Sequence, residues 1–445
     1  MNTPICSFVK AYSEKQALRL HMPGHKGQGA LGIESLDITE INGADSLYEA
    51  NGIIAQSESN ASELFGFPTY YSTEGSSQCI RAMLYLALLR AKQQGKKPVI
   101  AAAKNVHKTF LSAIALLDLD VMWLYPEDEQ SYLSCSITAR QLDSLFSASN
   151  ELPCAVYLTS PDYLGNIQDI EGISAVCRSY GIMLLVDNAH GAYLKFMEPS
   201  MHPIDLGADM CCASAHKTLP VLTGGAYLQL SPVINAFIGS HVKNALALFG
   251  STSPSYLIMQ SLDAANLYLC SYYEKLNAFV DEVEKLKSAL SEHGFILYGA
   301  EPLKLCIYAK AWGYTGQEMS LILEQAKIVS EFADPDYIVF LLTPEIGANG
   351  LRALRDALMA IPKRETITSK APGFVKTEKL LSIRQAMLSC AELVPVSEAE
   401  GRVLAAASVG CPPAVPIVVC GERIDSHAIE CFEYYGIEYC SVIEE

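Results

Sequence analysis

Apolar segments alternate with helical ones through the middle of the chain, and this alternation limits the possible folds more than any other feature. The expected strands cover residues 98–103, 120–125, 153–159, 182–186 and 210–213, and helices are expected at 57–65, 75–94, 107–117 and 172–180. Strands that are apolar at nearly every position are typical of a parallel sheet with helices on both faces, because both faces of each strand are then buried. The sequence therefore predicts an α/β fold with a mostly parallel sheet.

A second group of elements follows the first. One long helix is expected over residues 255–291, then strands at 295–298, 303–309 and 337–342, helices at 316–327 and 350–361, and a polar linker at 362–373. A chain of 445 residues is too long for one compact core. We expect an N-terminal arm over 1–56, a large domain over 57–270, a small α/β domain over 271–361 and a C-terminal region over 362–445.

The charge balance is acidic, with 32 basic and 49 acidic residues and a formal net charge of −17. Nucleic-acid binding needs a basic surface, so that class of partner is excluded. The sequence contains no run of the roughly 18 apolar residues that a membrane span requires, and no membrane partner is expected. The 14 cysteines form no Cys-x-x-Cys pair and fit reduced core side chains. We therefore expect a cytoplasmic protein.

Lys217 lies in the segment Ser214-Ala215-His216-Lys217-Thr218, directly after a short apolar strand. A buried or half-buried lysine is costly as a cation, so it is usually paired or used chemically. Asp187 closes the strand at 182–186, and sheets of this kind bind ligands at the carboxyl ends of their strands. A lysine that can form a Schiff base and a carboxylate that can keep a ring nitrogen protonated together predict a pyridoxal 5′-phosphate (PLP) site. On this pattern alone, a lysine that merely caps a strand is the alternative.

Gly75, Ser76 and Ser77 open the helix expected at 75–94. Their N–H groups and hydroxyls and the positive end of the helix suit an anion such as phosphate, but the same residues would serve equally well as an ordinary helix cap. His107 follows another expected strand and thus also falls at a carboxyl end of the sheet.

Two patterns in the N-terminal segment are rejected as binding sites. His21 and His25 are four residues apart, but a proline and a glycine between them break any helix that would align them, so no metal site is expected. Gly27, Gly29 and Gly32 spell G-x-G-x-x-G without a buried strand before them, so a dinucleotide site is not predicted.

Short motifs in a fixed order make the chain resemble the Orn/Lys/Arg decarboxylase family. They are His21-Met22-Pro23-Gly24-His25-Lys26-Gly27, Asp37-Ile38-Thr39-Glu40-Ile41, Gly75-Ser76-Ser77, Asp187-Asn188-Ala189-His190-Gly191, Ser214-Ala215-His216-Lys217-Thr218-Leu219-Pro220, Ser251-Thr252-Ser253-Pro254-Ser255-Tyr256, Pro412-Pro413-Ala414-Val415-Pro416 and Gly421-Glu422. The resemblance runs from about residue 8 to residue 440. The resemblance implies a PLP enzyme of the aspartate-aminotransferase fold type (type I), with a seven-stranded-type sheet in the large domain. Within the family, the chain resembles the short branch that lacks an N-terminal wing domain.

The resemblance also implies roles for individual residues. Lys217 would hold PLP, Asp187 would pair with its ring nitrogen and His107 would stack on the ring. The phosphate would be gripped by Ser76, Ser77, Ser214 and His216, and Gly75, Ala189 and His190 would line the same site. Ser251 and Thr252 would reach the cofactor phosphate of a partner subunit, which implies a homodimer or a higher homo-oligomer.

The chain departs from the family pattern at three positions. Ser46 and Tyr48 stand where family members often carry an acidic residue and a histidine, and Gly224 stands where a polar residue is common. These departures bear on substrate and cofactor contacts.

The function that this implies is PLP-dependent decarboxylation of a basic amino acid (arginine, lysine or ornithine) to CO₂ and a polyamine-type amine. The reaction needs an acid that returns a proton to the substrate carbon, and Lys217 and His216 are the candidates. We expect a carboxylate to hold the distal cation of the substrate, with Asp45, Glu331 and Asp334 in segments that would line the site. Another fold-type-I reaction (transamination, aldol cleavage or desulfuration) and a non-catalytic PLP-binding protein are the alternatives.

Overall fold

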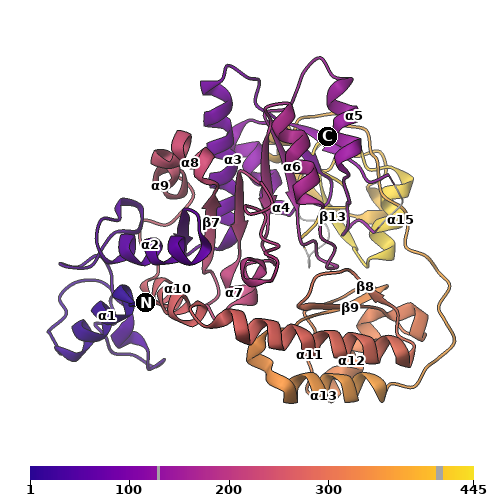
Figure 1. Ribbon diagram of the computed structural model, residues 1–445. Helices are drawn as coiled ribbons and strands as arrows, with labels where there is room; N and C mark the ends of the chain where they lie inside the picture. The colour runs from indigo at the N-terminus through magenta and orange to yellow at the C-terminus, as the bar shows by residue number, and fades with distance from the viewer. Residues whose placement is uncertain (128–130, 407–413, 445) are drawn as a thin grey trace. The chain divides into compact units, whose positions relative to one another are not determined.

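The computed structural model describes residues 1–127, 131–406 and 414–444, and two compact units make up the chain. Unit 1 consists of Met1–Lys96 and Met183–Asn277, and unit 2 of Lys97–Ile182 and Ala278–Glu445. Figure 1 labels their helices and strands. The predicted boundaries of the four parts of the chain stay predictions.

A seven-stranded sheet has the strand order β1-β7-β6-β5-β4-β2-β3. Its strands are β1 (Thr69–Ser72), β2 (Val99–Ala103), β3 (Asp120–Leu124), β4 (Ala155–Thr159), β5 (Met183–Asp187), β6 (Met210–Ala213) and β7 (Ala226–Leu230). The pairs β5–β6, β2–β4 and β2–β3 are parallel, whereas β7 runs antiparallel to both β6 and β1. The predicted α/β class with a mostly parallel sheet is confirmed.

Unit 1 contributes β1, β7, β6 and β5 to this sheet. Its helices are α1 (Pro4–Glu14), α2 (Ile53–Phe65), α3 (Gly75–Gln93), α7 (Ala215–Thr218), α8 (Pro232–Ile238), α9 (Val242–Ala247) and α10 (Tyr256–Leu269). β5 is buried at every position because its sequence, Met-Leu-Leu-Val-Asp, is apolar up to the last residue. β1 was not predicted, because Thr-Tyr-Tyr-Ser shows no continuous apolar run, yet three of its four residues are buried. Helix α1 was likewise not expected, since the N-terminal segment was interpreted as a loop.

Unit 2 combines β4, β2 and β3 with an antiparallel four-stranded sheet, order β10-β11-β9-β8, and a two-stranded sheet, β12-β13. The strands are β8 (Leu297–Tyr298), β9 (Lys304–Tyr308), β10 (Phe332–Ala333), β11 (Tyr337–Leu341), β12 (Ala391–Pro395) and β13 (Tyr439–Ile443). The helices are α4 (Lys108–Leu117), α5 (Ala139–Ser147), α6 (Ile170–Ser179), α11 (Tyr272–His293, which begins in unit 1), α12 (Gly316–Gln325), α13 (Gly347–Met359), α14 (Ile383–Met387) and α15 (Ser426–Tyr434).

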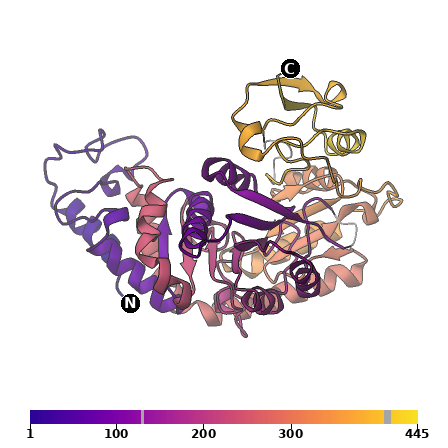
Figure 2. The same ribbon diagram turned by 90° about the horizontal axis from the view of Figure 1, so that it is seen from above.

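The C-terminal segment of unit 2, drawn in yellow in Figures 1 and 2, shares a hydrophobic core with earlier parts of the same unit. Val418, Phe432 and Val442 of this segment are fully buried in one cluster with Leu164 and Val339. The predicted C-terminal region therefore packs as an integral layer of unit 2. Pro412 and Pro413 of the predicted tail motif lie outside the described residues.

The single helix predicted over residues 255–291 is wrong in one respect. The structure has two helices there, α10 (Tyr256–Leu269) and α11 (Tyr272–His293), with a break at Cys270 and Ser271. No glycine or proline marks the break in the sequence. The Cys270 thiol donates to the carbonyl oxygen of Asn266, four residues earlier, at 3.4 Å. Side-chain bonds of this kind compete with the backbone ladder and locally bend or end helices.

Among the described residues, no helix is long and apolar enough to cross a membrane. The cysteines in the same part of the chain are all free thiols, most of them buried.

Candidate active site

Asp187 and Lys217 come from the ends of two adjacent parallel strands in unit 1. Asp187 is the last residue of β5 and pairs in register with Cys212 of β6. Ser214 follows β6 and is the N-cap of the short helix α7, which carries Lys217. Because β5 and β6 are parallel, their carboxyl ends meet at the same edge of the sheet. The register therefore brings the predicted aspartate and the lysine loop to one edge.

The Asp187 carboxylate is buried, with 2 % of its surface exposed. Its Oδ1 accepts a hydrogen bond from the backbone N–H of Ala189 at 3.1 Å and another from the Cys212 thiol at 3.5 Å. These contacts fix the carboxylate at the strand end.

Lys217 is half-buried, and its Nζ lies 3.1 Å from Nε2 of His190. His190 is buried in the turn after β5. That turn is joined to β6 on both sides: Asn188 N–H donates to Cys212 O at 2.9 Å, and Ser214 N–H donates to Ala189 O at 3.3 Å. The motif Asp187–Gly191 and the lysine motif are thus held together by backbone hydrogen bonds.

The backbone and the ring of His216 both contact the carbonyl oxygen of Gly225. Its backbone N–H donates to Gly225 O at 3.2 Å, and its Nδ1 lies 3.0 Å from the same oxygen, so Nδ1 carries the proton. Burial lowers the pKa of His216, the hydrogen bond to Gly225 opposes that shift, and the nearby charge of Lys217 adds to it. At neutral pH the ring is uncharged and its Nε2 has a lone pair instead of a proton.

The first turn of α3 carries Gly75, Ser76 and Ser77. The N-cap residue is Glu74, whose side chain makes no capping hydrogen bond. The two serines therefore lie inside the first turn of α3. The alternative interpretation, in which these residues serve as an ordinary helix cap, would place them at the cap position. Thr73 directly precedes Glu74, and Thr218 directly follows Lys217. The Oγ1 atoms of both threonines are buried and have no hydrogen-bond partner in the described structure.

Gly224 and Gly225 connect the first turn of α3 to the lysine loop through hydrogen bonds. This connection was not predicted from the sequence. Gly224 O accepts from Gly75 N–H at 2.7 Å, while Gly225 O accepts from His216. Gly224 has φ of +99°, and a Cβ there would lie 2.9 Å from the backbone oxygen of Thr73. Only glycine fits this position in the present chain. The Gly-Gly pair directly after the lysine loop was the available signal.

Tyr48, another departure, also contacts α3. Its hydroxyl accepts from Nε2 of Gln78 at 2.9 Å, and together the two side chains leave no room for a Cβ at Gly250. Ser251 and Thr252 follow Gly250 and are exposed. Both residues lie on the surface of unit 1, the unit that also contains Lys217.

His107 belongs to unit 2, where it is the N-cap of α4. Its Nδ1 accepts from Thr109 N–H at 3.2 Å and lies 2.9 Å from Thr109 Oγ1. The capping bond fixes the ring orientation from within its own unit.

The acidic candidates for the distal cation have structural partners. Asp45 is 6 % exposed, and its carboxylate accepts from the backbone N–H groups of Asn51, Gly52, Ile54 and Ala55. Burial raises its pKa, but these hydrogen bonds outweigh burial and lower it. We assign Asp45 to the start of α2. Glu331 accepts from the hydroxyl of Tyr163 at 3.1 Å, and Asp334 holds the β10–β11 turn through its bond to Asp336 N–H at 2.8 Å.

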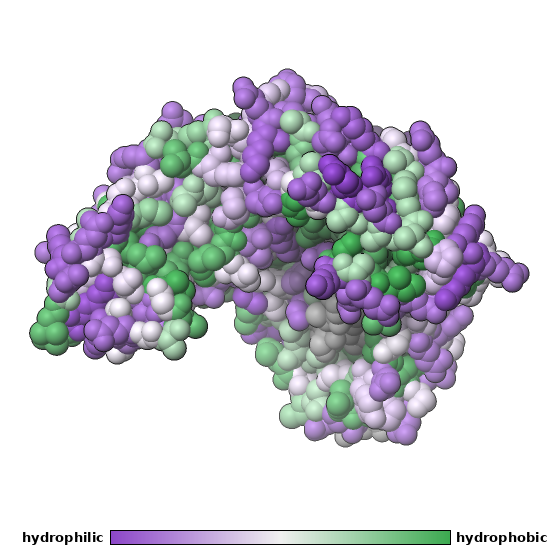
Figure 3. Space-filling model, turned by 90° about the horizontal axis from the view of Figure 1, so that it is seen from below, coloured by the Kyte–Doolittle hydropathy of each residue, from purple (hydrophilic) through white to green (hydrophobic). Residues whose placement is uncertain are grey.

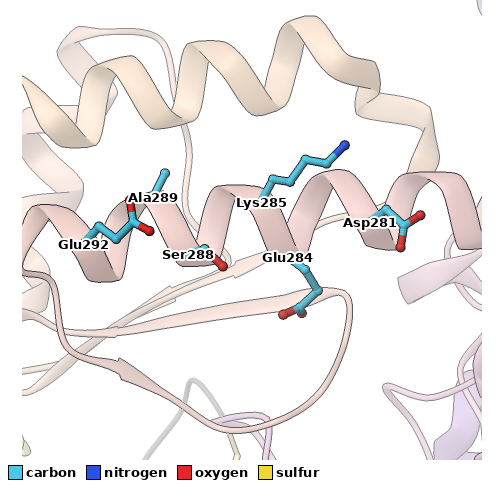
Figure 4. Close-up of a pocket in the computed structure, with 6 residues that line it drawn as sticks. All are labelled: Asp281, Glu284, Lys285, Ser288, Ala289 and Glu292. Atoms are coloured by element: carbon cyan, nitrogen blue, oxygen red, sulfur yellow. The ribbon is translucent and has the colours of Figure 1, made fainter.

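A surface pocket on α11 is lined by residues of that helix alone (Figure 4). Its lining is Asp281, Glu284, Lys285, Ser288, Ala289 and Glu292. None of the predicted site residues lies there, so the pocket is unrelated to the strand-end site.

Comparisons with known proteins agree with the motifs. The model of the Orn/Lys/Arg decarboxylase major domain matches residues 3–305, and that of the C-terminal domain of the same family matches residues 365–438. The chain is 29 % identical to an arginine decarboxylase of Bacillus subtilis, over 96 % of this chain and 92 % of the relative. It is also 29 % identical to the uncharacterised protein YaaO of the same organism, over 97 % and 93 %.

Solved structures agree in fold. The lysine decarboxylase LdcF of Francisella novicida superposes with a TM-score of 0.81 at 15 % identity, covering 99 % of this chain and 81 % of the other. A lysine decarboxylase from Pseudomonas aeruginosa gives 0.79 at 16 % identity, covering 99 % and 80 %.

The first family model alone covers well over half of the sequence. PLP is the cofactor of this family and of its fold-type-I neighbours. The chain belongs to the Orn/Lys/Arg decarboxylase family and is a PLP-dependent decarboxylase.

Proposed function

We propose that this decarboxylase acts on arginine in preference to lysine and ornithine, and that it releases CO₂ and the corresponding polyamine-type amine. The choice of arginine rests on sequence relatives from Bacillus subtilis, Bacillus anthracis and Bacillus cereus, which are named arginine decarboxylases and are 28–29 % identical over nearly the whole chain. The lysine decarboxylase structures are too distant in sequence to bear on the substrate.

One observation carries the assignment of the site, namely Lys217 and Asp187 at the ends of adjacent parallel strands. Bound PLP supplies an electron sink for the carbon that loses CO₂, provided that its ring nitrogen stays protonated. In our proposal Lys217 binds the cofactor covalently and Asp187 accepts the ring N–H. A buried carboxylate already fixed by Ala189 is suited to that contact, because little reorganisation is needed.

The phosphate would be bound by the first turn of α3, which presents Ser76 and Ser77. Two features support this. Glu74 does not cap the helix with its side chain, and the buried hydroxyls of Thr73 and Thr218 have no partner within the described structure. Buried polar atoms without partners are costly, and phosphate oxygens would satisfy them. Ala189, His190 and Ser214 would line the site, and His107 would stack on the cofactor ring.

Lys217 is the better candidate for the proton donor. His216 holds its only proton on Nδ1, toward Gly225, and burial favours its neutral form. Its Nε2 therefore accepts a proton more readily than it donates one. We assign His216 to orienting the lysine loop. A contact with the cofactor phosphate through Nε2 requires the ring to take up a proton there, so that Nε2 donates to a phosphate oxygen.

The working unit would be a homodimer or a higher oligomer. Exposed hydrophobic side chains gather in the N-terminal arm, where Leu18, Leu20 and Leu31 are 84 %, 83 % and 80 % exposed. Figure 3 shows apolar residues, coloured green, in patches on the face seen from below. Contiguous exposed apolar surface marks interaction sites. A partner would cover this arm and receive Ser251 and Thr252. A cytoplasmic location belongs to the same proposal, and the free cysteines agree with a reducing compartment.

Substrate choice is tested by CO₂ release from arginine, lysine, ornithine and norleucine. Norleucine keeps a similar chain but lacks the distal charge, and an unpaired cation in a desolvated pocket is costly. We expect kcat/KM for arginine to be the highest, and that for norleucine to be at least ~100-fold lower. Equal values for norleucine would contradict a site built for a cation.

Composite sites are tested by mixing two inactive variants. Lys217→Ala and the double variant Ser251→Ala/Thr252→Ala should regain part of the activity as hybrid dimers. With subunit exchange verified by labelled protomers, absence of any recovery would show that each protomer is self-contained.

A further inference from the structure

Segments of the C-terminal region hold both ends of helix α4, the helix that His107 caps. At its start, the Lys108 N–H donates to Ala414 O at 2.8 Å. At its end, Arg384 of α14 donates from Nη1 to Ala115 O at 2.7 Å. All four residues belong to unit 2, so these contacts lie within one compact body.

A buried ion pair makes a third connection, three residues before His107. Lys104 directly follows β2 and is 1 % exposed, and its Nζ lies 2.5 Å from Oε1 of Glu422, which is 3 % exposed. The second carboxylate oxygen, Oε2, accepts from Thr377 Oγ1 at 2.6 Å and from Val419 N–H at 2.9 Å. Both oxygens are thus occupied, so the carboxylate has one defined orientation.

The Gly421-Glu422 motif gives this carboxylate its inward direction. Gly421 has φ of +89°, and a Cβ there would lie 2.5 Å from the backbone oxygen of Leu381. Its N–H donates to Leu404 O at 2.8 Å. A glycine is required at this turn, and the turn aims the next side chain into the interior. This motif plays no part in the site described above.

Burying two charges is expensive, and well-packed apolar residues often stabilise a core equally well. A buried pair with one fixed geometry instead specifies position. We infer that Glu422, acting through Lys104, is a positioning residue that sets the β2–α4 loop and thereby the position of His107, whose ring orientation is fixed by its own bond from Thr109. This inference rests on the proposed role of His107 in binding the cofactor.

The test compares Glu422→Gln with Asp336→Asn, which breaks another buried ion pair of unit 2, Lys310–Asp336 at 2.9 Å. Two quantities are measured: amide hydrogen exchange of residues 104–110 in the cofactor-free protein, and PLP affinity from titration of that protein. Glu422→Gln should speed exchange at 104–110 and weaken PLP binding about 10-fold, as expected for coupled groups. Asp336→Asn should change neither quantity.

A double-mutant cycle links the effect to His107. In a His107→Ala background, Glu422→Gln should cause no further loss of PLP affinity, because the ring it positions is gone. Unchanged exchange at 104–110, or a full second 10-fold loss in that background, would overturn the inference. If Glu422→Gln does not fold, Thr377→Val removes one contact of the carboxylate and should weaken PLP binding about 2- to 3-fold. Failure of CO₂ release would instead count against the proposed function, because neither exchange nor affinity depends on turnover.

Discussion

Lys217 in unit 1 and three deeply buried lysines in unit 2 have different surroundings. In unit 2, Lys104, Lys304 and Lys310 are at most 3 % exposed, and each lies near a carboxylate, at 2.5, 3.8 and 2.9 Å respectively. In unit 1, Lys217 is only half-buried, and its Nζ faces the Nε2 of His190 at 3.1 Å.

In our proposal, the difference separates structural lysines from a reactive one. Beside a deeply buried lysine, a carboxylate favours the charged form and occupies the amine, although burial lowers the pKa of Lys104 on balance. A half-buried amine at a strand end, beside an imidazole, can lose its proton and form a covalent bond. Burial of a lysine alone therefore does not indicate catalysis, whereas its position at the edge of the sheet does.

Replacing the reactive lysine should give the largest effect. Lys217→Ala should lower kcat by about 10⁴-fold or more, roughly 5.5 kcal/mol of barrier, because the covalent attachment is lost. Stopped CO₂ assays measure the rate, and borohydride should fix the visible cofactor band to the peptide containing Lys217 in the wild type. Labelling of a different lysine would refute the assignment. The thermal midpoint should change little.

Replacing a structural lysine should give the opposite pattern. Lys310→Met leaves Asp336 as an uncompensated buried charge and should lower the free energy of unfolding by about 3–5 kcal/mol. Denaturant titration measures this loss, while the cofactor band at saturating PLP should stay unchanged. Adding Asp336→Leu should recover most of the stability. A stable Lys310→Met protein with impaired cofactor binding would remove the distinction between the two lysine classes.

The carboxylate of the first unit is tested by Asp187→Asn. The variant should still bind PLP, but kcat should fall about 30- to 1000-fold, or roughly 2–4 kcal/mol, because the ring nitrogen is no longer held protonated. Single-turnover CO₂ release separates this chemical defect from binding. Near-normal turnover would exclude an electron-sink role for Asp187.

The effect that is smallest per pH unit concerns a carboxyl group of unit 2. Burial raises the pKa of Asp334 to about 7, although its bonds from the Tyr337 and Asp336 N–H groups oppose the shift. The folded state then holds a proton that the unfolded chain releases near pH 4, so stability should fall as pH rises from about 4 to 7, by up to about 1.4 kcal/mol per pH unit. Asp334→Asn should flatten this slope in denaturant titrations between pH 4 and 8. An unchanged slope would assign the pH dependence to other groups.

Much of the fold was predictable because the strands of the parallel sheet are apolar at nearly every position. The segment 182–186 was expected as a strand, and β5 is Met183–Asp187. Elements whose stability comes from their neighbours were missed. β1 shows no continuous apolar run. The break between α10 and α11 lies beside the bond from the Cys270 thiol to Asn266 O, and no turn residue marks it in the sequence.

The sequence by itself determined the family, the cofactor and the lysine and aspartate motifs, because covalent chemistry demands particular residue types at strand ends. Tertiary structure alone decided how these residues are used. In the folded chain, the proton of His216 points toward Gly225 O, and the Asp45 carboxylate accepts from the N–H groups at the start of α2. Glu422 pairs with Lys104, which lies 318 residues away in the chain. Hydrogen bonds and ion pairs form between groups that the fold brings together, and their separation along the chain carries no information about that distance.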